Sequence, residues 1–383
     1  MRVALAPRAR PAAFDAPPLL DRRGARVILG CRSVALPTPL RPAADSLFGP
    51  RGVCLAGATG PLAICDTGHH RMLIWRTRPE VDGAPADLVL GQPDFASEGR
   101  NAGGAVGAGT LNVPTGVAWA DGVLAVADAW NHRVLLWHGP VTRTGQPADV
   151  VLGQPDFGSA SPNRGAAAPR ADSLNWCYGV SLDGGRLLVA DTGNRRALVW
   201  HRVPTRNGTP ADIVLGQPGW DVRDEDAGGR DAALGMRWPH AACMVDRCVA
   251  VADAGKSRIM LWHALPDRPG VPCDAVLGQA DAAGGTANRA AAVPTRASLN
   301  QPFGLARLGD HLVVADTANA RLLGFAPADL VTGAVADRAT GGEEGGWHME
   351  RDHLSWPYGV SARGATLAIA DTGNNRVLLW ESA

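Results

Sequence analysis

Aromatic side chains, lysine and long apolar runs are all scarce in this chain of 383 residues. Phe, Trp and Tyr together make up 5% of it, and 12 of these residues are Trp against only two Tyr, so the aromatic supply is specialised. No run of 18 apolar residues is present, which excludes a hydrophobic membrane-spanning helix. Residues 1–25 are rich in Arg and Pro without a continuous apolar segment, so we expect no secretory signal.

An excess of either charge is absent as well. The chain has 37 basic and 37 acidic residues, and Lys256 is its only lysine. This balance argues against a nucleic-acid binder that works by bulk electrostatics, although it permits a local basic patch. The seven cysteines are an odd number and form no Cys-x-x-Cys motif, which fits a reducing compartment better than a disulfide framework. We therefore expect a cytoplasmic protein.

What the chain does contain is a repeat of ten residues that begins with Asp and ends with an aromatic residue. Asp and Arg are five residues apart in every copy, and successive copies begin 55 to 63 residues apart. The six copies are Asp66–Trp75, Asp128–Trp137, Asp191–Trp200, Asp253–Trp262, Asp316–Phe325 and Asp371–Trp380. A period of this length indicates a propeller or another repeat architecture.

Each unit also contains four short apolar runs, bounded by Gly, Asp, Asn and Pro, which we name strands a to d. In the second unit they are residues 116–119, 124–127, 133–137 and 149–152. Runs of this length are typical of strands and too short for helices. Four strands in each of six units predict an all-β fold, a six-bladed β-propeller with four-stranded blades.

The two ends of the chain complement each other. The last unit supplies strands a, b and c within residues 358–380 and has no strand d, whereas residues 26–30 form an isolated strand near the start. Pairing strand 26–30 with the C-terminal blade would close the ring and cover two sheet edges. We therefore expect residues 26–383 to form a single propeller and residues 1–25 to form a flexible N-terminal arm.

The segment from strand b to strand c, as in Val189–Trp200, resembles the NHL repeat, and the copies at 126–137 and 369–380 match it best. All six units match to some degree, so the resemblance covers about residues 26–383. The element Leu-Gly-Gln-Pro-Asp-Phe at 90–95 resembles an extension common in bacterial NHL-repeat proteins. The resemblance implies the propeller fold. It leaves function open, because NHL propellers include protein- and RNA-binding modules and a related amidating lyase is an enzyme.

Topology predicts which side of the ring carries a site. Neighbouring strands of a blade are antiparallel, so the b–c turns and the loops from strand d to the next strand a emerge on the same side. The d–a loops are long, about 20 residues in most units, whereas the a–b connections are short. Long loops on a rigid scaffold commonly carry binding sites. We call this side the loop-rich face.

Two positions on that face differ from blade to blade, unlike the Asp and Arg of the repeat, which we expect to be structural. The residue before the strand-a glycine, or before Ala241 in the fourth unit, should line the mouth of the central channel. In chain order it is Arg51, Thr115, Tyr178, His240, Phe303 and Tyr358. The residue two places earlier is Trp in three blades: Trp176, Trp238 and Trp356. Aromatic clusters with a few polar groups suit recognition of a peptide or ligand. The same side chains would equally serve to pack the loops.

We therefore favour a non-catalytic binding or scaffold propeller. It would recognise a protein segment, a peptide or a small molecule around the central channel, and we assign no catalytic residue. The binding residues would be Arg51, Trp176, Tyr178, Trp238, His240, Phe303, Trp356 and Tyr358.

Two alternatives stay open. A metal-dependent enzyme of the lactonase or lyase kind would hold a divalent metal ion at the channel mouth. His69 and His132 in neighbouring b–c turns are candidate ligands, but no short ligand spacing accompanies them. RNA binding would need a basic face, which the neutral net charge disfavours.

Overall fold

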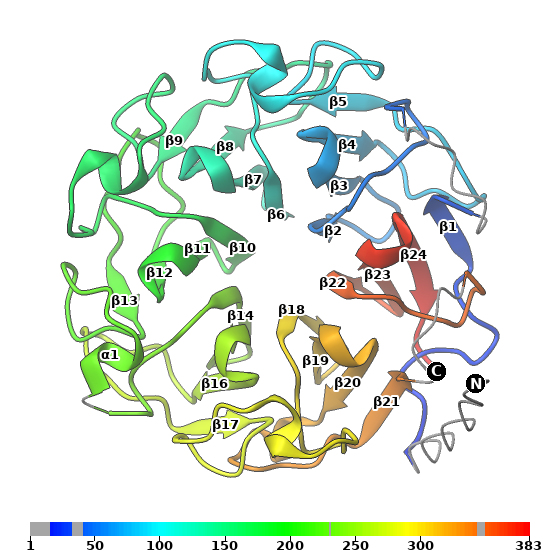
Figure 1. Ribbon diagram of the computed structural model, residues 1–383. Helices are drawn as coiled ribbons and strands as arrows, with labels where there is room; N and C mark the ends of the chain where they lie inside the picture. Colours follow the sequence, from blue (N-terminus) through cyan, green and yellow to red (C-terminus); the bar gives the residue numbers. More distant parts are fainter. Residues whose placement is uncertain (1–15, 33–40, 230, 343–348) are drawn as a thin grey trace, which may run out of the picture.

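The computed structural model describes residues 16–32, 41–229, 231–342 and 349–383. Six four-stranded antiparallel sheets stand around a central channel, as Figure 1 shows. The predicted all-β fold, a six-bladed β-propeller, is confirmed. We number the blades 1 to 6 in chain order, and each contributes one strand a to d from the channel outward. In the described ranges no helix is long and apolar enough to cross a membrane.

The two inner strands of each blade come first. Strand a is β2 (Val53–Leu55), β6 (Pro114–Ala120), β10 (Cys177–Asp183), β14 (Pro239–Val245), β18 (Pro302–Leu308) and β22 (Pro357–Arg363) in blades 1 to 6. Strand b is β3 (Leu62–Asp66), β7 (Val123–Asp128), β11 (Arg186–Asp191), β15 (Cys248–Asp253), β19 (His311–Asp316) and β23 (Thr366–Asp371).

The two outer strands follow the same order. Strand c is β4 (Arg71–Trp75), β8 (Arg133–His138), β12 (Arg196–Trp200), β16 (Arg258–Trp262), β20 (Arg321–Phe325) and β24 (Arg376–Glu381). Strand d is β5 (Leu88–Leu90), β9 (Val150–Leu152), β13 (Ile213–Leu215), β17 (Ala275–Leu277), β21 (Arg338–Gly341) and, for blade 6, β1 (Val27–Gly30).

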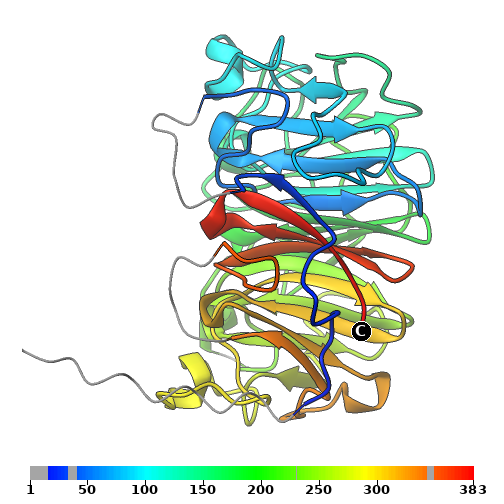
Figure 2. The same ribbon diagram turned by 90° about the vertical axis from the view of Figure 1, so that its right-hand side faces the viewer.

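Short helical turns connect the strands. A 3₁₀ turn forms each b–c connection: η1 (Thr67–His69), η3 (Ala129–Asn131), η5 (Thr192–Asn194), η6 (Ala254–Lys256), η8 (Thr317–Asn319) and η10 (Thr372–Asn374). The d–a loops contain η2 (Arg100–Gly103), η4 (Pro162–Gly165), α1 (Asp226–Gly229) and η7 (Ala287–Ala290), and η9 (Pro327–Asp329) follows β20. Figure 2 shows the b–c turns on one side of the disc, which is the loop-rich face.

The ring closes as predicted. Strand β1 pairs antiparallel with β24, from Val27 opposite Leu379 to Gly30 opposite Arg376. Figure 2 shows the dark-blue β1 beside the red β24. Closure gives the last blade its fourth strand, so the edge of β24 is paired.

The predicted arm of residues 1–25 is described only from residue 16 onward, and its flexibility stays a prediction. Leu19 and Leu20 are 3% and 1% exposed and pack among side chains of blades 5 and 6. The carbonyl of Asp21 accepts a hydrogen bond from Nε1 of Trp380 at 2.7 Å. In blades 1 to 4 a carbonyl of the c–d loop accepts the corresponding Trp bond, as Gln146 does for Trp137. The segment before β1 therefore replaces the c–d loop that blade 6 lacks.

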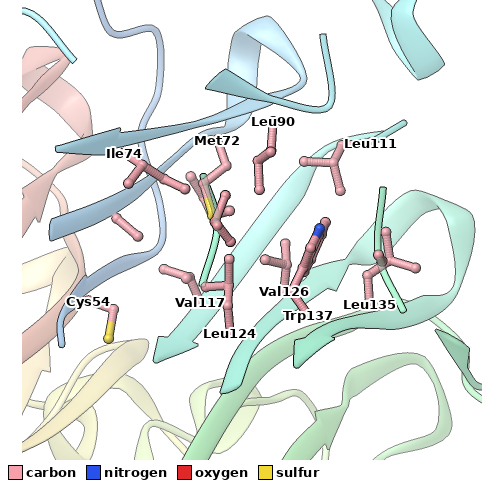
Figure 3. Packing of buried hydrophobic residues seen from close by; sticks show 14 of the residues in the cluster. Cys54, Met72, Ile74, Leu90, Leu111, Val117, Leu124, Val126, Leu135 and Trp137 are labelled. Atoms are coloured by element: carbon pink, nitrogen blue, oxygen red, sulfur yellow. The ribbon is translucent and has the colours of Figure 1, made fainter. Parts of the chain in front are cut away.

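The core lies between blades. Between blades 1 and 2, Met72 and Ile74 of β4 face Leu124 and Val126 of β7, and Trp137 fills the outer part of the same cluster (Figure 3). Buried apolar area of this kind is the main favourable contribution to folding. Five further clusters repeat the arrangement around the ring.

The repeated Asp and Arg hold each blade to its loops. In blade 2 the fully buried Arg133 donates from Nε to Asp128 at 2.7 Å and from its terminal nitrogens to the carbonyls of Phe157, Gly107 and Thr110. Asp128 also accepts the backbone N–H of Asn112. The same Asp–Arg bond is present in all six blades. Charged hydrogen bonds within the blade fix the loop bases, so this pair is structural.

Candidate functional site

A β-bulge at the start of strand a sets one residue of each blade apart. In blade 2, Pro114 pairs with Asp128 and Gly116 with Ala127, so Thr115 has no partner across the ladder. The register shifts in the same way at Tyr178, His240 and Phe303, and in blade 6 around Tyr358. Bulges commonly redirect a side chain next to a functional site. Most residues predicted to line the mouth are therefore bulge residues.

A glycine follows the mouth residue in every blade except blade 4, which has Ala241, and close packing at the channel explains it. A Cβ atom on Gly179 would lie 2.3 Å from the carbonyl oxygen of His240 in the next blade. At Gly304 and Gly359 the corresponding distances, to the carbonyls of Tyr358 and Arg51, are 2.2 Å. A side chain does not fit at such distances. The inner strands therefore approach closely, which brings the bulge residues of different blades together.

Five of the predicted residues meet at one place. The ring of His240 lies 4.4 Å from that of Phe303, 5.0 Å from that of Tyr178 and 6.0 Å from that of Tyr358, centroid to centroid. The Arg51 Cζ atom lies 5.2 Å from the Tyr358 ring centre and 5.9 Å from the Tyr178 ring centre. These side chains come from blades 1, 3, 4, 5 and 6, whose innermost strands surround the central channel in Figure 1. Their mutual distances therefore bring them together over the channel. We call Arg51, Tyr178, His240, Phe303 and Tyr358 the collar.

Hydrogen-bonding groups of the collar are available to a ligand. Within the described residues, the Arg51 guanidinium has no hydrogen-bond or ion-pair partner, and neither do the hydroxyls of Tyr178 and Tyr358. Nδ1 of His240 donates to the carbonyl of Trp238 at 3.0 Å, which leaves Nε2 as an acceptor. Burial, with a smaller effect from Arg51, lowers the pKa of His240 to about 4, so the ring is neutral at pH 7.

The three predicted tryptophans are exposed on the loop-rich face. Trp176, Trp238 and Trp356 are 49%, 47% and 43% exposed, and we call them the rim tryptophans. Trp356 contacts the collar, with its ring 6.2 Å from that of Phe303. Trp176 stacks on His132, and Trp238 lies beside Arg237; neither has a ring contact to the collar in the described parts of the chain.

Two rim tryptophans have an unfavourable backbone conformation. Trp176 and Trp356 have φ values of 49° and 57°, in the left-handed region. This region costs a bulky residue on the order of 1–2 kcal/mol. Gly49, Val113 and Gln301 have the same conformation at this position of the repeat, so it belongs to the architecture of the blades. The neutral ring of His132 supports Trp176 by accepting its backbone N–H at Nδ1, and burial lowers the His132 pKa to about 4.

Sequence reasoning missed two aromatic residues of this face. Phe48 and Trp130 are 45% and 42% exposed, and Arg100 lies 5.3 Å from the Trp130 ring centre. Trp130 stands in a b–c turn where the other blades have Gly or Ala, so this substitution within the repeat was a usable signal. Every strongly exposed Trp or Phe of the described residues therefore lies on the loop-rich face.

The two candidate metal ligands have other partners. His69 is buried, and its Nδ1 lies 2.8 Å from an Asp66 carboxylate oxygen. His132 accepts from Trp176 and belongs to the next blade. Among the described residues, no three His, Cys, Asp or Glu side chains gather in a group that could hold a metal ion.

The opposite face offers a different kind of hollow. It lies between blades 1 and 2, measures about 520 Å³ and is lined mainly by apolar atoms. Its walls include Ile74, Trp119 and Val141, and Arg76 stands at its edge. This hollow is a competing place for a ligand.

Comparison with known proteins supports the fold and no more. No family model matches the chain, and no curated protein sequence matches it. The WD40 β-propeller domain of Doa1 superposes with a TM-score of 0.50 at 9% identity, covering 94% of this chain and 96% of that one. A Bacteroides thetaiotaomicron protein of unknown function gives 0.50 at 12% identity, covering 98% and 76%. A gluconolactonase from Xanthomonas campestris gives 0.49 at 13% identity, covering 98% and 100%. At these identities the likeness shows the propeller fold alone.

Proposed function

We propose that this chain is an NHL-type propeller that acts as a non-catalytic binding module, with a segment of a partner protein docking on the loop-rich face. One observation carries the proposal: every strongly exposed Trp or Phe of the described residues lies on that face. Exposed aromatic clusters mark interaction sites, because Trp and Tyr contribute large buried areas when a partner covers them.

The NHL assignment rests on the repeat and on its structural role. The Asp–Arg bond recurs in all six blades. The Gln of the bacterial-type extension ties neighbouring loops together: Gln154 donates to the carbonyls of His132 and Ser161. A cytoplasmic location belongs to the same proposal and is supported by free thiols at Cys54, Cys65, Cys177, Cys243, Cys248 and Cys273.

A phage-displayed library of random peptides, selected on the immobilised protein, tests the binding role. Enriched peptides should bind the Trp238→Ala and Trp356→Ala variants at least tenfold more weakly, a loss of about 1.4 kcal/mol or more that is typical of hot-spot truncation. The matched control is Val331→Ala, which changes an exposed apolar residue of the opposite face. It should bind like the unmodified protein.

Three results would overturn the proposal. Enriched peptides that ignore both Trp variants but are lost on Trp119→Ala would place recognition in the hollow of the opposite face. A library that yields no binder would leave the exposed aromatics without a role in binding. Hydrolysis of a lactone panel that a chelator abolishes would show a metal-dependent enzyme instead.

A further inference from the structure

We infer that the collar is a receptor for the terminal carboxylate of a peptide chain, held by the Arg51 guanidinium between Tyr178 and Tyr358. The inference rests on the proposed function and specifies which part of the partner enters the channel mouth. The free C-terminus of a protein or peptide would point into the collar, and the preceding residues would lie over the rim tryptophans.

The first support is an uncompensated charge. Arg51 is half-buried, and no carboxylate pairs with it in the described parts of the chain. Two other cations of the same face have acidic partners: Arg237 lies 2.9 Å from Glu225, and Lys256 lies 2.6 Å from Asp226. Arg195 instead donates to the carbonyl of Arg223, a kind of bond that Arg51 lacks within the described residues. A partly desolvated guanidinium without a counter-ion is costly, and an anionic ligand would remove that cost.

The second support is the way Arg51 is held. Its guanidinium lies near the rings of two tyrosines from different blades, at 5.2 and 5.9 Å. Contacts with aromatic rings stabilise a cation and restrict its motion, while its N–H groups stay available. A planar fork of N–H donors matches a carboxylate, which can accept two parallel hydrogen bonds.

The third support is the set of neighbouring polar groups. The Tyr178 and Tyr358 hydroxyls can donate, and burial raises the pKa of the Tyr358 phenol, so this group stays protonated. The neutral His240 adds no second positive charge, and its Nε2 can accept the N–H of the terminal peptide group. Phe303, stacked against His240, supplies an apolar surface for the terminal side chain.

The charge pattern favours a peptide end over a nucleic acid. The collar contains one cation, whereas a single-stranded nucleic acid brings one phosphate per nucleotide and needs a cationic track. Beyond the collar, the acidic Glu225 and Asp226 already neutralise Arg237 and Lys256. One carboxylate at the end of an otherwise uncharged segment fits this arrangement.

The test uses synthetic hexapeptides with free C-termini, arrayed through their N-termini, and the same peptides with amidated C-termini. The strongest binders are then titrated in solution against the full chain. We expect amidation to weaken binding at least tenfold. Arg51→Gln should weaken the free acid by a similar factor and leave the amide unchanged, because the two changes remove the same interaction. Arg202→Gln, at an exposed arginine of the opposite face that does not line the hollow, is the matched control and should change neither.

Further variants and probes keep the test decisive. If Arg51→Gln lowers the melting temperature, Tyr178→Phe and Tyr358→Phe remove only hydroxyl groups and should each weaken the free acid severalfold. Equal binding of acids and amides through Trp238 would overturn this inference and leave the proposed function intact. Absence of any peptide binder would overturn both. Tighter binding of 3-phenylpropanoate than of every peptide would identify a small carboxylic acid as the ligand, and tighter binding of oligouridylate would identify RNA.

Discussion

Tryptophan has two roles in this propeller, and the burial of each Trp side chain shows which role it has. Trp262 ends a strand c, is 1% exposed, and donates from Nε1 to the carbonyl of Val271 at 3.0 Å. Trp238 lies on the loop-rich face with 47% of its surface exposed. The same residue type is therefore architectural where the repeat places it and available for contacts where it departs from the repeat.

Replacing these two tryptophans should separate stability from binding. Trp262→Ala should lower the free energy of unfolding by about 3–5 kcal/mol, because it leaves a cavity between blades. Trp238→Ala should change it by about 0.5 kcal/mol or less, as surface substitutions do. Urea unfolding followed by circular dichroism gives both values. Equal losses at the two positions would contradict the division into core and rim tryptophans.

Three histidines of the loop-rich side should make the protein sensitive to acid. Burial lowers the pKa of His70, and it lowers those of His132 and His240 to about 4. A histidine whose folded-state pKa is depressed binds its proton more readily when the chain unfolds. Stability should therefore fall as the pH drops below about 6.5, by at most about 1.4 kcal/mol per pH unit for each histidine.

A matched variant isolates one of these groups. Asn375 accepts the backbone N–H of Gly49 in the way that His132 accepts that of Trp176, so His132→Asn should keep the hydrogen bond and remove the titration. We expect a smaller loss of stability between pH 6.5 and 4 in this variant, measured by urea unfolding at several pH values. An unchanged pH dependence would show that His132 does not contribute.

At the scale of elements, two kinds of side-chain hydrogen bond connect neighbouring blades. In the first, the Thr that opens a b–c turn donates to a carbonyl before the next bulge: Thr67 to Pro114, Thr192 to Pro239, Thr317 to Pro357 and Thr372 to Pro50. In the second, the residue that ends the turn accepts a backbone N–H: His70 from Val113, His132 from Trp176, Ser257 from Gln301 and Asn375 from Gly49.

The two kinds complement each other around the ring. Ala129 and Ala254 have no hydroxyl to donate, and Arg195 and Ala320 have no side-chain acceptor. Every junction nevertheless has at least one bond of the two kinds, and both junctions of blade 1 have two. Blade 1 therefore has the most connections of this type, next to the place where the ring closes.

Thr67 and Thr192 offer a matched comparison, because each is 5% exposed. Thr67→Val leaves the His70 bond at its junction, whereas Thr192→Val removes the only bond of these two kinds between blades 3 and 4. Each change should cost about 1–2 kcal/mol, since a buried carbonyl loses its donor. We expect the Thr192 variant to lose about 1 kcal/mol more in urea unfolding. Equal losses would show that the second bond does not support the junction.

At the scale of the whole molecule, stability depends on joining the two ends of the chain. Strand β1 completes blade 6, and Leu19 and Leu20 pack behind it among residues of blades 5 and 6. A propeller without this strand would expose the edge of β24, and exposed edges favour aggregation.

Deletions and substitutions near the N-terminus should therefore destabilise the protein by weakening the closure of the ring. Deleting residues 1–32 should cause aggregation, and Leu20→Ala should lower the free energy of unfolding by about 2–4 kcal/mol. Calorimetry with size-exclusion chromatography measures each variant. A deletion of 1–32 that stays monomeric with an unchanged melting temperature would contradict closure by β1.

Repetition along the chain was enough to predict the number of blades, the four strands in each and the closing strand. Each unit needs the same alternation of strand and turn, and the same Asp and Arg to anchor its loops. The same residue pattern therefore recurs six times with the same internal spacing. The residues of the channel mouth were predicted from variation between units instead of repetition. Arg51, Tyr178 and His240 differ at a position where a structural residue would recur.

The contacts between blades could not be predicted in this way, because they join residues far apart in the chain. Arg51 and Tyr358 are neighbours only after the ring closes, and the absence of an acidic partner for Arg51 in the described residues depends on every loop around it. The burial of Leu20 likewise depends on blades 5 and 6. Local sequence patterns specify a blade. The chemistry of the channel mouth depends instead on the distances between side chains of different blades, which only the tertiary structure sets.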